Sequence, residues 1–315
     1  MKKILLASTA LVGMAGAAAA EITLSGYAEI GIFGGDLVET QFHNDWQVNF
    51  NFSTETDNGL SIGGKVQIEE TNGANATNGG LKIDDEAFWV SGTFGKITLG
   101  ETDGAFDWAL TEIYSGTSIF DDHSTHSGAY WFTGLDGGYN NQIMRYEYSF
   151  GDFAVAVSVE QDDDKLPLGG LSDPIPGDGI TMDTIWAIGG KWSGDMGGNS
   201  VSAGLGYTSN GSIDIVGLSA GVSMPSGFSV NLGYTDFGGT MNDNWFGIAA
   251  AYTAGPLLVG VNYGEYDSGG SGFGLVANYD LGGGVVAMAG YGSSDVASFN
   301  GNGSDTFSLG LGMSF

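Results

Sequence analysis

Apolar residues alternate one by one with polar or small residues along most of this chain. The C-terminal segment Asp305–Phe315 shows the pattern in its purest form, with apolar residues at every second position: Phe307, Leu309, Leu311, Met313 and Phe315. Period-two alternation is typical of a strand with one apolar and one polar face. About sixteen such segments follow one another without changing to a helical period, which predicts an all-β fold: a transmembrane antiparallel β-barrel, apolar outside and wet inside.

The connections between the predicted strands support this fold. The first strand is expected at Ile22–Phe33, followed by a loop over Gly34–Asn44 and a second strand at Asp45–Thr54. Connections after even-numbered strands are short, and those after odd-numbered strands are mostly longer, as in outer-membrane barrels. A soluble β-sandwich or propeller is the alternative, but the sandwich would need a second sheet over its aromatic faces, and no blade repeat is present.

Aromatic residues gather near the ends of the predicted strands. Barrels place such residues at the two membrane interfaces, so we predict aromatic girdles there. The residues concerned are Trp46, Trp89, Tyr148, Phe150, Trp192, Tyr207, Phe228, Tyr234, Tyr252, Tyr291 and Phe315.

Residues 1–20 have the pattern of a secretory signal peptide. Lys2 and Lys3 precede the apolar run Ile4–Val12, and Ala18–Ala20 supply a small-residue cleavage site. We therefore expect Sec-dependent export, and residues 21–315 to form the barrel in the outer membrane of a Gram-negative bacterium.

The composition restricts the partners. The chain has 8 Lys and Arg residues against 37 Asp and Glu residues, a formal net charge of −29. Nucleic-acid binding depends on basic residues that contact phosphates, so the charge argues against it and suits cations. Glycine is abundant, with 57 residues, which fits turns and strongly coiled strands.

The alternation stops over Glu101–Asn141, which we predict to be a loop folded into the lumen as a constriction. A structureless stretch of this length is usually functional, and rings of Asp and Glu select for cations. A solvated external loop is the alternative reading. The acidic residues expected to line the constriction are Glu101, Asp103, Asp107, Glu112, Asp121, Asp122 and Asp136. By strand parity, the basic residues expected on the pore wall are Lys65, Arg145 and Lys191.

No catalytic constellation emerges, so no enzyme activity, resident metal or cofactor is predicted. His123 and His126 beside the acidic pair Asp121–Asp122 could ligate a metal, and Asp162–Asp164 could attract calcium, but solvated loops are favoured for both.

Several segments resemble the Gram-negative general diffusion porins, most closely those of Rhodobacter-like alphaproteobacteria. They are TETDNGLSIGGKV (Thr54–Val66), FWVSGTFGKITLG (Phe88–Gly100), RYEYSFGDFAVAVS (Arg145–Ser158), ANYDLGGGVVAMAGYG (Ala277–Gly292) and the terminal LGLGMSF. The resemblance implies a sixteen-stranded barrel, a homotrimer, and contact with membrane lipids and lipopolysaccharide. It also implies that Glu101–Asn141 is the inward-folded third loop, and that Phe315 is the signal read by the outer-membrane assembly machinery.

In that family, loop acids face basic residues on the wall; this chain departs by having few basic residues. We therefore expect a passive, water-filled pore for small hydrophilic solutes and ions that prefers cations. A substrate-specific channel, with Trp108 or Trp131 beside the loop acids, and a surface adhesin are the alternatives.

Overall fold

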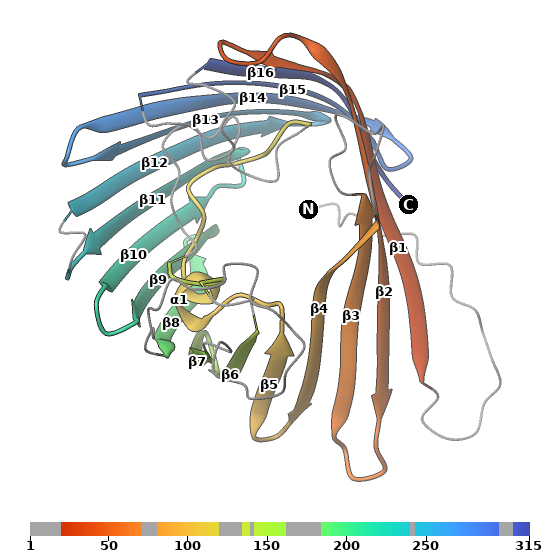
Figure 1. Cartoon of the computed structure of the whole chain (residues 1–315), viewed down its shortest axis with the longest axis vertical. Helices are drawn as coiled ribbons and strands as arrows, with labels where there is room; N and C mark the ends of the chain where they lie inside the picture. The colour runs from red at the N-terminus through yellow and green to blue at the C-terminus, as the bar shows by residue number, and fades with distance from the viewer. Residues whose placement is uncertain are drawn as a thin grey trace, which may run out of the picture.

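The chain folds into a closed barrel of sixteen antiparallel strands (Figure 1). The structure, a computed structural model, describes residues 20–70, 81–119, 134–138, 142–161, 184–239, 243–295 and 305–315. The strands are β1 (Glu21–Gly35), β2 (Gln41–Glu55), β3 (Ser61–Glu70), β4 (Leu81–Gly92), β5 (Gly95–Gly100), β6 (Ile143–Phe150), β7 (Phe153–Glu160), β8 (Ile185–Met196), β9 (Asn199–Ser209), β10 (Asp214–Ser223), β11 (Phe228–Phe237), β12 (Asp243–Ala254), β13 (Leu257–Tyr266), β14 (Gly270–Gly282), β15 (Val285–Ser294) and β16 (Asp305–Ser314).

Each strand pairs with its neighbours in the sequence, and β1 closes the ring against β16. In that closing pair Ile32 lies opposite Leu309, and Ile30 lies opposite Leu311. Closure pairs the backbone of every strand on both sides, which a sheet surrounded by hydrocarbon requires. The predicted barrel is therefore confirmed.

The outward face of the strands is apolar and exposed. On β7, Phe153, Val155 and Val157 are exposed, whereas Ala156 and Ser158, which alternate with them, are buried inside the barrel. A continuous apolar exterior of this kind is suited to lipid acyl chains rather than to water. Among the described residues, no helix has the length and apolar character needed to span a bilayer.

One predicted girdle residue, Trp89, faces the lumen instead. The register between β3 and β4 shifts after Lys65, and Trp89 lies opposite Gly63 on the inner face. A Cβ atom on Gly63 would lie 2.4 Å from the Trp89 ring, so the ring occupies the space above this glycine. The bulge that causes the shift reverses which residues of β4 face inward, and simple alternation does not reveal it.

The first predicted loop is also shorter than expected. The sequence predicts a loop over Gly34–Asn44, but β1 continues to Gly35 and β2 begins at Gln41, which pairs with Phe33. Here the ladder of backbone hydrogen bonds continues although polar Asn44 interrupts the apolar face of β2.

The segment after β5 folds inside the barrel. Residues Glu101–Ile119, which we call the inner segment, contain the short helix α1 (Ala105–Ala109) and lie within the ring of strands (Figure 1). Apolar side chains of the inner segment and of the wall form a buried core inside the lumen: Ala105, Phe106, Ile113, Ala156, Ala187, Ile215, Phe237, Trp245 and Ala249.

Candidate pore constriction

Helix α1 lies on a part of the wall that is lined by glycine. Gly189 of β8, Gly206 of β9 and Gly217 of β10 are direct neighbours across the sheet. A Cβ atom on Gly189 would lie 2.0 Å from the carbonyl oxygen of Ala105, and one on Gly204 would lie 2.1 Å from that of Ala109. The helix backbone therefore approaches the wall as closely as it does because these positions carry no side chain.

Two side chains satisfy the backbone at the start of α1: Asp136, from the segment between β5 and β6, and Ser158 of β7. The N–H of Gly104 donates to Asp136 Oδ2 at 2.7 Å, and the N–H of Ala105 donates to Ser158 Oγ at 2.8 Å. The first N–H groups of a helix have no acceptor within the helix, so Asp136 and Ser158 supply the missing acceptors. They also fix where α1 begins on the wall.

Beyond α1, the inner segment follows the wall across successive strands. The N–H of Thr111 donates to Ser219 Oγ of β10 at 2.8 Å, and Asn278 Nδ2 of β14 donates to the carbonyl of Thr117 at 2.9 Å. Ser308 of β16 hydrogen-bonds Ser118 through the two hydroxyls at 2.7 Å. The inner segment is thus attached at both ends and along its length.

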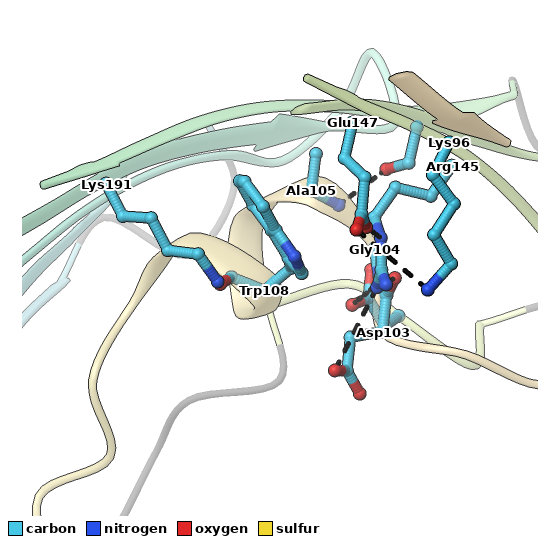
Figure 2. Close-up of polar contacts among 10 residues, drawn as sticks. Lys96, Asp103, Gly104, Ala105, Trp108, Arg145, Glu147 and Lys191 are labelled. Atoms are coloured by element: carbon cyan, nitrogen blue, oxygen red, sulfur yellow. Dashed lines mark hydrogen bonds and ion pairs between the residues drawn. The ribbon is translucent and has the colours of Figure 1, made fainter. Parts of the chain in front are cut away.

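Two of the predicted basic wall residues lie beside α1 (Figure 2). Arg145 is buried, with Nε donating to Glu147 Oε2 at 3.0 Å and Nη1 donating to the carbonyl of Asp103. Lys191 Nζ donates to the carbonyl of Trp108 at 2.8 Å and lies 3.7 Å from the centroid of its ring. Arg145 and Lys191 therefore attach the inner segment to the wall rather than face it across the lumen.

The third predicted wall residue, Lys65, lies on β3, away from α1. Its Nζ forms an ion pair with the carboxylate of Asp85 on β4. Lys82 on the same strand pair lies 2.7 Å from Asp84 and 3.7 Å from Glu69. On this part of the wall, Lys65 and Lys82 therefore each lie beside at least one carboxylate.

The predicted acids occupy different environments. Asp103 and Glu112 are exposed to water inside the barrel, whereas Asp107 and Asp136 are half-buried near the start of α1. Glu101 accepts a hydrogen bond from the backbone N–H of Asp85 at 2.8 Å. Asp121 and Asp122 lie outside the described residues, as do Trp131, His123, His126 and Asp162–Asp164. No cluster of metal-ligating side chains occurs in the described ranges.

Burial makes two of these acids hard to ionise. Loss of water raises the pKa of Asp107 to about 8, and the charges of Asp103, Asp136 and Glu112 add to the effect. Burial also raises the pKa of Asp136 to about 7, against the hydrogen bond from Gly104, which lowers it. Part of the negative charge of the site is therefore controlled by pH near neutrality.

Three acids beyond the predicted set complete the site. Glu147 of β6 binds Arg145 and lies 3.9 Å from Lys96, and Glu160 of β7 accepts from the N–H of Gly137 at 3.1 Å. Both lie on the face of their strand that carries Arg145 or Ser158, so parity could have identified them. The third, Asp85, lies at a bulge, and only the structure reveals its direction.

Fold and site together define a membrane-spanning β-barrel with a segment of its own chain folded inside it. A profile of the Gram-negative porin family matches residues 7–298. The chain therefore belongs to the Gram-negative porins, as its resemblance to them predicted.

Individual relatives agree. The chain is 32% identical to a porin of Rhodobacter capsulatus over 143 residues, which are 44% of this chain and 44% of that protein. It is 25% identical to a porin of Fuscovulum blasticum over 284 residues, covering 84% of this chain and 92% of the relative. A solved structure of a mutant of Rh. blastica porin has a TM-score of 0.69 at 22% identity and covers 93% of this chain and 100% of that one. This last similarity concerns the fold alone.

Proposed function

We propose that this porin is a passive, water-filled channel of the outer membrane that admits small hydrophilic solutes and ions and prefers cations. Family membership and the barrel support the channel in the outer membrane. The cation preference rests on how charge is distributed inside the barrel.

The observation that carries this preference is that the inner segment contains four acids, Glu101, Asp103, Asp107 and Glu112, and no Lys or Arg. Among the described residues, Lys65, Lys82, Lys96 and Arg145 each lie within 4.0 Å of a carboxylate. Asp103 and Glu112 are exposed on the inner segment. An excess of carboxylates beside a water-filled path attracts cations and repels anions.

The assembly proposed for the chain follows its family. We propose a homotrimer surrounded by lipid and lipopolysaccharide, Sec-dependent export directed by residues 1–20, and a role for Phe315 in outer-membrane assembly. The 64% exposure of Phe315 is consistent with its being read by another protein.

The test is conductance of the purified protein in a planar bilayer with a salt gradient across it. We expect steady, nearly ohmic steps and a reversal potential of cationic sign. The double variant D103N/E112Q should move that potential toward zero, whereas D57N, which removes an exposed acid from the turn between β2 and β3, should leave it unchanged.

Conductance steps without cation preference would support the pore but contradict the role proposed for the acids of the inner segment. Absence of steps from folded protein would exclude the channel and favour an adhesin. Saturable block by one solute would instead favour a substrate-specific channel.

A further inference from the structure

A β-bulge on the lumen wall places an acid where strand alternation would not put one. The register between β3 and β4 shifts between Lys65 and Gln67, and Asp85 occupies the shifted position. Its φ angle is 50°, and Asp85 is the only described residue other than glycine with a positive φ. Aspartate tolerates the left-handed region better than most residues, and bulges commonly redirect a side chain.

The bulge is joined to the root of the inner segment. The N–H of Asp85 donates to Glu101 Oε2 at 2.8 Å, and the N–H of Glu101 donates to the carbonyl of Glu86 at 2.9 Å. Gly100, just before, has a φ of 126°, and a Cβ atom there would lie 2.1 Å from the same carbonyl. The unusual backbone of Asp85 is therefore stabilised by the point at which the inner segment leaves the wall.

The side chain of Asp85 forms an ion pair with Lys65, and this pair faces water. The side chains are 39% exposed for Lys65 and 47% exposed for Asp85, against 7% for Arg145 beside α1. Ions that pass this wall therefore encounter Lys65 and Asp85 together. Lys82, Asp84 and Glu69 lie on the same two strands, so with Glu101 the described cluster carries two positive and four negative formal charges.

We propose that Asp85 is a selectivity-determining residue of the channel, because it neutralises Lys65 on the open wall. Without Asp85, Lys65 would lose its ion-pair partner, and the net negative charge of the cluster would fall from two to one. With Asp85, this part of the wall keeps a net negative charge and adds to the acids of the inner segment. The proposal deepens the proposed cation preference and rests on the channel function.

Single substitutions in the pair should shift selectivity in opposite directions. D85N removes one negative charge and retains a side chain that tolerates a positive φ, so the permeability ratio of K⁺ to Cl⁻ should fall. K65M removes the positive charge and should raise that ratio. One unit charge about 10 Å from an ion in water at low salt changes the local concentration of cations and of anions about twofold each, in opposite directions, so each shift of the ratio should be up to about fourfold.

The double variant K65M/D85N tests whether charge is the cause. It has the same net charge as the natural pair, so its permeability ratio should return close to the starting value. D85G removes the same charge and also the steric cost of the positive φ, so it should match D85N in selectivity. D57N controls for loss of an acid elsewhere, and heat-dependent mobility in gels confirms that each variant is folded.

Shifts of the same sign for D85N and K65M, or a double variant that does not return, would overturn the proposal. These outcomes are independent of the starting preference. A natural channel without cation preference would contradict the proposed function, whereas opposite shifts around that value would still support the role of Asp85.

Discussion

The ammonium group of Lys191 lies over the indole ring of Trp108, 3.7 Å from its centroid, and donates to the carbonyl oxygen of the same residue at 2.8 Å. One side chain of β8 thereby contacts both the ring and the backbone of α1 (Figure 2). The contact connects the wall of the barrel to the segment that lies inside it.

Replacing Lys191 with methionine should loosen α1. K191M keeps much of the aliphatic length but removes the cation–π contact and the hydrogen bond, and the first of these contributes about 0.5–1 kcal/mol at an exposed site. We expect more current noise and more frequent brief closures in single-channel recordings, while K191R, which retains the charge, should remain quiet. Equal noise in K191M and the natural protein would contradict this role.

The glycine wall beneath α1 gives a pair of matched substitutions. G189A places a methyl group 2.0 Å from the carbonyl of Ala105, whereas G190A, on the outward face, meets only the carbonyl of Ala154 at 3.9 Å. Overpacking of this kind costs about 1–3 kcal/mol, so α1 should move away from the wall and into the lumen. We expect lower conductance for G189A only; equal conductance of the two variants would show that α1 is not held this closely.

Selectivity should depend on pH because of two half-buried acids. Burial raises the pKa of Asp107 to about 8 and that of Asp136 to about 7, so both gain negative charge as the pH rises from 6 to 9. Cation preference should therefore increase over that range, and the dependence should be weaker in D107N/D136N. Reversal potentials measured at fixed salt and varied pH provide the test, and an unchanged profile in the double variant would exclude these residues.

The same pKa shifts bear on stability. A carboxyl group whose pKa is raised in the folded state favours folding in its neutral form, and this advantage is lost as the pH rises through the raised pKa. The inner segment should consequently be cleaved faster by added protease at pH 9 than at pH 6. The difference should be smaller in D107N/D136N, and equal cleavage at both pH values would contradict it.

The C-terminal residue should matter more for delivery than for the folded barrel. Phe315 exchanges two backbone hydrogen bonds with Gly26, of 3.0 and 2.7 Å, while its ring stays largely exposed. F315A retains both bonds, so purified protein should refold as before, yet less should reach the outer membrane of cells. F315Y, which preserves an aromatic ring, is the control; normal membrane levels of F315A would contradict the assembly role.

The barrel could be predicted from sequence because its rule is local. Alternation along each strand depends only on neighbours in the chain, and every predicted strand corresponds to an observed one. Helix α1 could not be predicted in this way, since AFDWA (Ala105–Ala109) is too short to show a helical period. It is stabilised by close packing on the glycines of the wall and by the hydrogen bonds that Asp136 and Ser158 accept from its first N–H groups.

The alternation along a strand also does not show which inward side chains lie next to the inner segment. It places Arg145 and Lys191 on the inner face, but only their contacts with Asp103 and Trp108 show that they lie under the inner segment. Asp85 and Trp89 needed the bulge in β4 to be known before their directions could be assigned. Sequence alone therefore does not give the direction of a side chain that follows a bulge, or the neighbours of a side chain that contacts a distant part of the chain.

The apolar core inside the lumen has a consequence for how the channel matures. Phe106 and Ile113 of the inner segment pack with Ile215, Phe237 and Trp245, which lie about a hundred positions or more further along the chain. That core cannot assemble until β10, β11 and β12 are paired. The inner segment also bonds to Asn278 of β14 and Ser308 of β16, so its last contacts form only when the final strands are in place. We therefore expect the passage to reach its final width at the end of assembly, after the strands around it have paired.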